Sequence, residues 1–379
     1  MLNNYSPANS SPAPSWHAAL AALALLIVML VGAWQMVAAA LNPAGLDFPR
    51  SWTDFREGRT TGTLEKQLDH KLPARKTLIA AANSVRYTLT GGGGEQVRTG
   101  KDGWLFLTDE LRFDAGGSAH LSARVALFEA AARRLDRQGV KLVVALVPDK
   151  ARLYSSKLAN GRYPEYNRSR YQDTLAALRM HGVTVTDLLT PLTLGAVQGD
   201  VYYRSDTHWN QTGAQVAADA VALTVRQLGV DLEKTSFSSM TAGAQAERPG
   251  DLIRLMGLDD TPNALRPRPD LEAPVVTRQI SVDNAGGLFG DAVVPVVLTG
   301  TSYSLRGNFH GYLQQALTAK VLNVAKDGGG LLQATTEYLT DESFRSAKPK
   351  VLVWEVPERF MFTKLDGEPK WLERVALRP

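Results

Sequence analysis

The stretch VVPVVLTGTSYS, residues 293–304, joins a run of apolar residues to a turn that contains two serines. The run at 293–298 is typical of a strand that is buried on both faces of a parallel sheet. Two similar runs occur in the chain, VKLVVALV at 140–147 and VLVWEV at 351–356. Because helical patterns separate these runs, the sequence predicts an α/β fold with a mostly parallel sheet and helices on both faces.

Helical spacing and shorter apolar runs fill the intervals. We expect helices at 77–89, 121–138, 171–180, 213–228, 305–317 and 331–339, and further strands at 104–107, 183–188, 274–280 and 320–324. Residues 232–290 are irregular and rich in Gly, Pro and Asp, which indicates a long insertion or lid. We therefore expect a main α/β domain at 100–379, preceded by a linker and helical lead-in at 42–99.

The N-terminal region contains a long apolar segment. Residues 18–41 carry no charge, and a helix of this length crosses the hydrocarbon layer of a membrane. A cleaved signal peptide is the alternative, with small residues at 38–40 as the cleavage site. However, the run is longer than a normal signal core, and no Lys or Arg precedes it. The sequence thus favours a transmembrane anchor at 18–41, behind a disordered N-terminus at 1–17.

Composition excludes several kinds of function. The net charge of +4 over 379 residues is mild, and no basic cluster with interleaved aromatic residues is present, so we expect no nucleic-acid partner. The absence of cysteine excludes disulfides, thiolate metal sites and a cysteine nucleophile. The glycine run at 91–94 lacks the frame of a phosphate-binding loop. We expect no cofactor.

Asp206 and His208 stand two residues apart, behind a possible strand at 201–203. In extended backbone both side chains would point to one face, so the carboxylate could orient the ring and leave its other nitrogen for a nucleophile. A metal-ligand pair or ordinary loop chemistry are the alternatives. No His-x3-His spacing supports a metal site, and none is expected. His310 is a competing base, but it has no carboxylate near it in sequence.

Ser302 lies in a turn between a buried strand and an expected helix. Catalytic groups of parallel sheets gather at the carboxyl ends of the strands. A serine at a helix N-terminus exposes its Oγ close to free backbone N–H groups, which can stabilise an oxyanion. The alternative is that Ser302 or Ser304 only caps the helix.

Five short motifs occur in order between residues 100 and 359: GKDGWLF at 100–106, VPDK at 147–150, DTHWN at 206–210, GTSYS at 300–304 and WEVPER at 354–359. This set resembles the alginate O-acetyltransferases of the AlgJ/AlgX type. The resemblance implies an SGNH-hydrolase-like fold with a permuted motif order, in which Asp-x-His precedes the serine. The serine motif reads Gly-Thr-Ser in place of Gly-Asp-Ser, and the second oxyanion donor is unassigned.

The resemblance also implies roles for single residues. It makes Ser302 the nucleophile, His208 the general base and Asp206 the residue that orients His208. Four further residues are candidates for sugar or donor contacts, with packing at strand ends as the alternative: Tyr203, Trp209, Tyr303 and Arg359.

The implied function is O-acetyl transfer through a serine ester onto hydroxyl groups of an exported polysaccharide, such as alginate, cellulose or a similar exopolysaccharide. The implied partners are the polysaccharide, a multi-spanning membrane O-acyltransferase as acetyl donor, and other proteins of exopolysaccharide synthesis and export. The implied location is the inner membrane with a periplasmic catalytic domain, or the periplasm if a signal is cleaved. An acetyl esterase with the same triad and a non-catalytic component of the export complex are the alternative functions.

Overall fold

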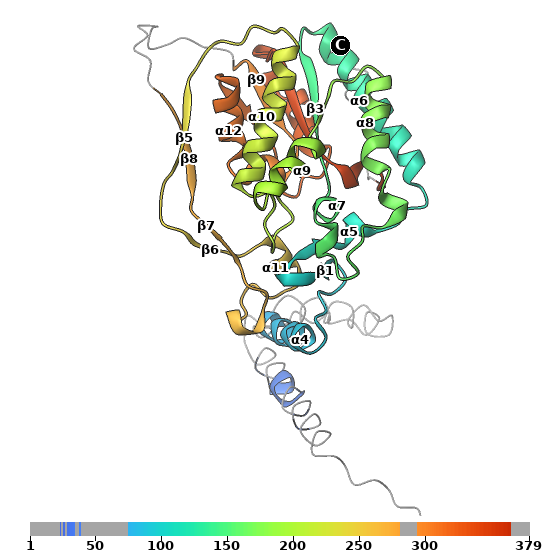
Figure 1. The fold of residues 1–379 in the computed structure, drawn as a ribbon, viewed down its shortest axis with the longest axis vertical. Helices are drawn as coiled ribbons and strands as arrows, with labels where there is room; N and C mark the ends of the chain where they lie inside the picture. Colours follow the sequence, from blue (N-terminus) through green and yellow to red (C-terminus); the bar gives the residue numbers. More distant parts are fainter. Residues whose placement is uncertain are drawn as a thin grey trace, which may run out of the picture. The chain divides into compact units, whose positions relative to one another are not determined.

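The computed structural model describes residues 75–280 and 294–364, together with residues 23, 26, 29–34 and 38 (Figure 1). The chain divides into two compact units, Met1–Ile79 and Ala80–Pro379. The disordered N-terminus predicted at 1–17 and the linker predicted from residue 42 lie outside the described residues.

The predicted transmembrane helix at 18–41 requires correction. Within the described part of the chain, no helix is both long enough and apolar enough to cross a membrane. Most of 18–41 lies outside the described residues. A run without charges is compatible with a membrane span but does not by itself establish one continuous helix. The single-pass anchor, and the inner-membrane location predicted from it, are therefore not supported by the described residues.

The core of the second unit is a five-stranded sheet in the order β10-β9-β11-β3-β4. Its strands are β3 (Lys141–Val147), β4 (Val185–Asp187), β9 (Val296–Thr299), β10 (Val321–Asn323) and β11 (Val351–Pro357). All neighbouring strands pair in parallel, so the sheet is wholly and not only mostly parallel. The three apolar runs recognised in the sequence form its three central strands. This explains why they lack a polar face.

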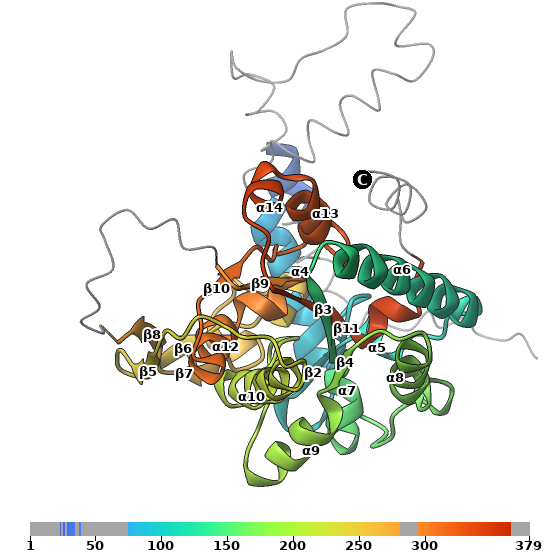
Figure 2. The ribbon, with the colours of Figure 1, turned by 90° about the horizontal axis from the view of Figure 1, so that it is seen from above.

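Helices cover both faces of the sheet, as the view from above shows (Figure 2). One face packs against α9 (Leu189–Gln198), α10 (Gln211–Gln227) and α12 (Phe309–Leu317). The other packs against α6 (Gly117–Arg137), α8 (Arg170–Met180) and α13 (Gln333–Thr340). Successive residues of β3 alternate between these two cores, as the two-residue period of a strand requires.

Several further elements lie outside the main sheet. They are α4 (Arg75–Thr90), β1 (Val97–Thr99), β2 (Leu105–Leu107), α5 (Thr108–Leu111), α7 (Lys150–Leu153) and α14 (Glu342–Ser346). β1 and β2 form an antiparallel pair. β2 is the strand expected at 104–107, while β1 carried no recognisable signal.

The region predicted as an irregular insertion contains two antiparallel strand pairs. β5 (Phe237–Thr241) pairs with β8 (Val275–Gln279), and β6 (Ala246–Arg248) pairs with β7 (Asp270–Glu272). The short helix α11 (Asp251–Leu255) follows β6. In Figure 1 the two pairs follow one another along a single ribbon beside α12. We call residues 237–279 the excursion.

Candidate active site

The structure brings together the three residues that the sequence assigned to catalysis. Ser302 Oγ lies 2.7 Å from His208 Nε2, and His208 Nδ1 lies 2.6 Å from Asp206 Oδ1. His208 and Asp206 are buried, while Ser302 is half-buried. A serine, a histidine and an aspartate that are hydrogen-bonded in this order form an arrangement that can activate a serine hydroxyl.

The nucleophile turn (residues 300–304) begins where β9 ends. Gly300 has φ +143°, and a Cβ there would lie 2.6 Å from the backbone oxygen of Glu355, so this position requires glycine. Ser302 opens the short 3₁₀ helix η5 (Ser302–Leu305), and Thr301 is its cap, accepting a hydrogen bond from the Tyr303 N–H. The alternative that a serine caps the helix is therefore not what the structure shows.

The long helix expected at 305–317 begins only at Phe309. Gly307 and Asn308 both have positive φ, 62° and 60°, and these values are incompatible with a continuous helix. Ser302 thus lies on a short 3₁₀ turn and not at the N-terminus of α12.

A carboxylate from the neighbouring strand holds the nucleophile turn. Glu355 on β11 is fully buried and accepts hydrogen bonds from the Thr301 N–H (2.7 Å), from the Thr301 hydroxyl (2.9 and 3.0 Å) and from the Ser304 hydroxyl (3.2 Å). Burial raises the pKa of the Glu355 carboxyl above its usual value. These contacts connect the nucleophile turn directly to the centre of the sheet.

The acid loop (residues 204–209) does not have the extended geometry that the sequence suggested. Residues 201–203 form no strand, and Tyr202 makes only an isolated bridge to Trp209. The carboxylate of Asp206 instead accepts from the backbone N–H of His208 at 2.9 Å as well as from its ring. This turn, in which an aspartate bonds to the second residue after it, explains how an i, i+2 pair meets without a strand.

A buried lysine fixes the backbone of the acid loop. Lys150 is fully buried, and its Nζ donates to the backbone oxygens of Leu105 (2.6 Å), Arg204 (2.9 Å) and Asp206 (2.9 Å). The ammonium also lies 5.1 Å from the ring centre of Trp104. Burial lowers the pKa of Lys150 to about 8. The GKDGWLF and VPDK motifs thus supply the lysine and the environment that holds it.

The excursion supplies three further charged residues to the acid loop. Asp270 accepts from the backbone N–H groups of residues 204 and 205, both at 2.9 Å. Asp251 accepts from the Thr207 N–H at 2.7 Å. Arg248 donates to Asp206 Oδ2 at 2.9 Å. Sequence reasoning missed all three because the excursion has no periodic pattern, and only their position relative to the acid loop marks them.

The rival histidines face other partners in the described parts of the chain. His310 Nε2 lies 2.7 Å from the backbone oxygen of Val321, and so it does not serve Ser302. His120 and His181 pair with surface carboxylates, at 3.8 and 2.9 Å. His208 is accordingly the histidine that the structure places beside Ser302.

Among the described residues, Asp206, His208 and Asp251 have ligand atoms within 4.8 Å of one another. This spacing is short enough for the three to share a metal ion. Both oxygens of Asp206 already accept hydrogen bonds, one of them from the Arg248 guanidinium. A cation at this point would meet that positive charge, so the residues fit a metal poorly.

The four predicted substrate contacts lie mostly inside the protein. Trp209 and Tyr303 are fully buried, Tyr203 is 4% exposed, and Arg359 is half-buried. The Tyr303 hydroxyl donates to the Thr207 backbone oxygen at 2.8 Å. Their contact with substrate stays a prediction, and their burial favours the packing role that the sequence left open.

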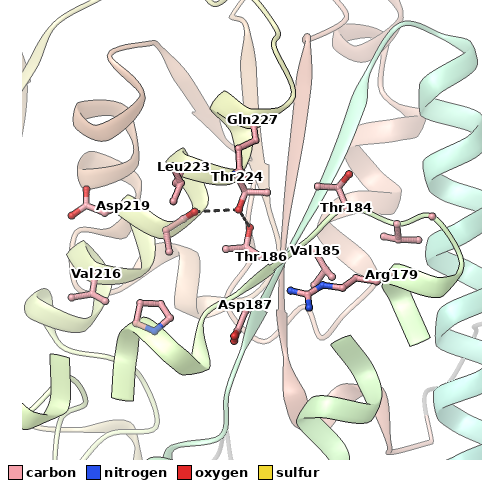
Figure 3. A pocket seen from close by; sticks show the side chains of 14 residues that line it. Arg179, Thr184, Val185, Thr186, Asp187, Val216, Asp219, Leu223, Thr224 and Gln227 are labelled. Carbon is pink, nitrogen blue, oxygen red and sulfur yellow. Dashed lines mark hydrogen bonds between the residues drawn. The ribbon is translucent and has the colours of Figure 1, made fainter. Parts of the chain in front are cut away.

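Two hollows in the described surface differ in their relation to the site. A polar one of about 380 Å³ borders the acid loop and is lined in part by Tyr203, Arg204, Gln211 and Glu272. A larger one of about 930 Å³ follows the edge strand β4 between α8 and α10. Figure 3 shows Thr186 and Thr224 of the larger hollow hydrogen-bonded to each other at 2.9 Å. No residue of the Asp206–His208–Ser302 set is among those lining it.

The parallel sheet, with a serine after one strand and a histidine in a neighbouring loop, defines a protein of the SGNH hydrolase-like class. Residues 97–358 match the family model described as SGNH hydrolase-like domain, acetyltransferase AlgX. The chain belongs to this acetyltransferase family. This confirms the SGNH-like α/β fold and the prediction of a polysaccharide O-acetyltransferase.

Individual relatives agree with this assignment. The chain is 34% identical to the probable alginate O-acetylase AlgJ of Pseudomonas aeruginosa, over 92% of this chain and 90% of that protein. The solved O-acetyltransferase domain of Pseudomonas putida AlgJ is 35% identical, with a TM-score of 0.66, and the match covers 74% of this chain and 99% of the domain. Pseudomonas aeruginosa AlgX is 27% identical, with a TM-score of 0.57 and coverage of 78% and 70%.

Proposed function

We propose that this chain transfers acetyl groups onto hydroxyl groups of an alginate-type polysaccharide through an acetyl ester on Ser302. The observation that carries the proposal is the hydrogen-bonded series Ser302–His208–Asp206, with distances of 2.7 and 2.6 Å. The acceptor is inferred from relatives named alginate O-acetylase and alginate biosynthesis protein.

In the first half-reaction, Ser302 Oγ attacks the carbonyl carbon of the acetyl donor, and its proton passes to His208 Nε2. Asp206 stabilises the resulting imidazolium at Nδ1. The negative charge on the carbonyl oxygen is stabilised by the backbone N–H of Ser302. The bond to the leaving group of the donor then breaks, and that group takes the proton from His208. The acetyl group stays on Ser302 as an ester.

In the second half-reaction, a sugar hydroxyl gives its proton to His208 Nε2 and attacks the ester carbon. Ser302 Oγ leaves and recovers the proton. Water in place of the sugar would release acetate by the same steps, so exclusion of water separates a transferase from an esterase.

The proposal includes specific partners. A multi-spanning membrane O-acyltransferase would supply the acetyl group, and other exopolysaccharide synthesis and export proteins would bring the acceptor. The relatives named as alginate biosynthesis proteins support this wider assignment.

The test uses the full chain with 4-nitrophenyl acetate, with and without alginate oligosaccharides, and follows the products by mass spectrometry. Acetylated sugar is the expected product, together with an acetyl group on the Ser302 peptide. Ser302→Ala should lower turnover by about 10³-fold or more. His310→Ala is the matched control and should retain activity, because this histidine faces β10. Acetate alone would favour an esterase, and turnover by Ser302→Ala equal to that of the parent would show that the nucleophile is another residue.

A further inference from the structure

Both oxygens of the Asp206 carboxylate are committed. Oδ1 accepts from the backbone and from the ring of His208, at 2.9 and 2.6 Å. Oδ2 accepts from Arg248 at 2.9 Å and from the Asp251 N–H at 3.1 Å. With partners on each oxygen, the carboxylate cannot rotate without breaking contacts on both sides. The Oδ2 partners therefore determine where Oδ1 points.

Arg248 is itself held in place. Its Nε lies 3.2 Å from Glu272 Oε2, and its guanidinium lies over the Tyr203 ring at 4.0 Å from the ring centre. Its side chain is 22% exposed. A planar guanidinium that stacks on an aromatic face and bonds two carboxylates loses little freedom when it pairs with Asp206.

The local charge balance also depends on Arg248. Asp251 Oδ2 lies only 3.5 Å from His208 Nδ1, so a second carboxylate competes for the ring. Burial, and next the charge of Asp206, raise the pKa of Asp251. Burial opposes ionisation of Asp206 too, but His208 and then Arg248 hold its pKa below the usual value. Arg248 thus offsets the repulsion between neighbouring acids at this point.

The backbone of the excursion meets the acid loop without intervening side chains. A Cβ at Gly250 would lie 1.9 Å from the Ser205 backbone oxygen, so only glycine allows this approach. Gly250 lies between Arg248 and Asp251 in sequence, and both neighbours bond to the acid loop. The contact holds Arg248, the last residue of β6, in a fixed position relative to Asp206.

We infer that Arg248 is a positioning residue for acetyl transfer: its guanidinium fixes the second oxygen of Asp206 so that the first stays on His208 Nδ1. This inference rests on the proposed function of Ser302. It makes the excursion, which the sequence suggested as a lid, part of the support of the triad. In this role Arg248 acts through Asp206 and does not contact the reacting atoms.

The experiment measures the rate at which the full chain forms the Ser302 acetyl ester from 4-nitrophenyl acetate, with kcat and KM determined separately. Arg248→Ala should lower kcat about 100-fold, the scale of a misplacement near 1 Å, while KM changes little. Arg248→Lys should lie between this variant and the parent, because it keeps the charge but not the planar fork. Guanidinium chloride, added far below denaturing concentrations, should raise the rate of Arg248→Ala, whereas sodium chloride of equal ionic strength should not.

Arg254→Ala is the matched control, since Arg254 lies in the same excursion on α11 and is exposed. It should acetylate Ser302 like the parent. Parent-like kcat in folded Arg248→Ala would overturn the inference. A slow Arg248→Ala that neither lysine nor guanidinium restores would also overturn it, since the loss would then be structural. An unlabelled Ser302 in the parent itself would instead show that the proposed nucleophile is wrong, and this inference would fall with it.

Discussion

The two halves of the proposed triad are held by different parts of the molecule. The nucleophile turn is hydrogen-bonded to Glu355, a fully buried residue of the central strand β11. The acid loop is held by Lys150, which closely follows β3, and by Arg248, Asp251 and Asp270, which come from the excursion. The position of the serine is thus set by the core of the fold, whereas the position of the acid depends also on a peripheral segment.

The largest expected effect distinguishes Asp206 from Asp251 as the carboxylate that orients the His208 ring. Asp206→Asn should slow acetylation of Ser302 by about 10⁴-fold, because an amide at 2.6 Å from Nδ1 favours the wrong tautomer. Asp251→Asn should cost about tenfold or less, because Asp251 lies 3.5 Å away and acts mainly on Thr207. Single-turnover mass spectrometry of the Ser302 peptide measures both rates. Equal losses would mean that the two acids share the role.

The second prediction compares how strongly each half is held. Glu355→Leu leaves the Thr301 N–H and two hydroxyls without their buried acceptor, and it should lower the free energy of unfolding by about 3 kcal/mol. Asp270→Ala leaves two backbone N–H groups and the Ser205 hydroxyl without their acceptor, but at a more accessible position where water can replace it, and should cost about 1.5 kcal/mol. Urea unfolding measures both. A larger cost for Asp270→Ala would reverse the comparison.

The two halves should also respond to pH in opposite directions. Burial raises the pKa of Glu355 above its usual 4.5, so its contribution to stability is full below pH 4.5 and is lost as pH rises through the folded-state pKa. The pKa of Asp206 is held below its usual 3.8, since the contacts with His208 and Arg248 outweigh the effect of burial. Its contribution is present above pH 3.8 and is lost as pH falls through the folded-state pKa.

Urea unfolding of variants over a pH series separates these two effects. Glu355→Gln should flatten the decline of stability above pH 4.5, and Asp206→Asn should flatten the decline below pH 3.8. A parent-like pH profile in Glu355→Gln would show that Glu355 is ionised in the fold like an ordinary surface acid.

The smallest effect concerns Asn210, the residue between the acid loop and α10. The Asn210 side chain accepts from the Gly213 N–H at 2.9 Å and so caps α10. Asn210→Ala should lower the free energy of unfolding by about 1 kcal/mol, the usual contribution of such a cap. The acetylation rate should stay close to that of the parent, because the loop keeps its contacts with Lys150 and the excursion. A large loss of activity would show that α10 also positions the acid.

The sequence predicted the sheet well, because its signals there are local. The runs at 140–147, 293–298 and 351–356 are almost entirely apolar, and each overlaps one of the central strands. The pairing of Ser302 with His208 was also predicted, from the strand-to-turn context and from the resemblance. Such features depend on residues that are close together in the chain or that form ordered motifs.

The supports of the site could not be predicted, because they depend on contacts between distant segments. Nothing near Arg248 in sequence indicates that it meets Asp206, forty-two residues earlier. The strand expected at 201–203 is absent, since the acid loop is held by side chains in place of a strand ladder. The helix expected from residue 305 starts later, because two residues with positive φ precede it.

The place of β11 has a consequence for biosynthesis. β11 is the last strand in the described part of the chain, yet it lies in the middle of the sheet and is the partner that joins β9 to β3. A growing polypeptide therefore has the strand before the serine and the strand before Lys150, but no neighbour to connect them, until residue 357 has left the ribosome. Glu355 arrives on that same strand. We expect nascent chains to remain unreactive toward acetyl donors until β11 has been synthesised.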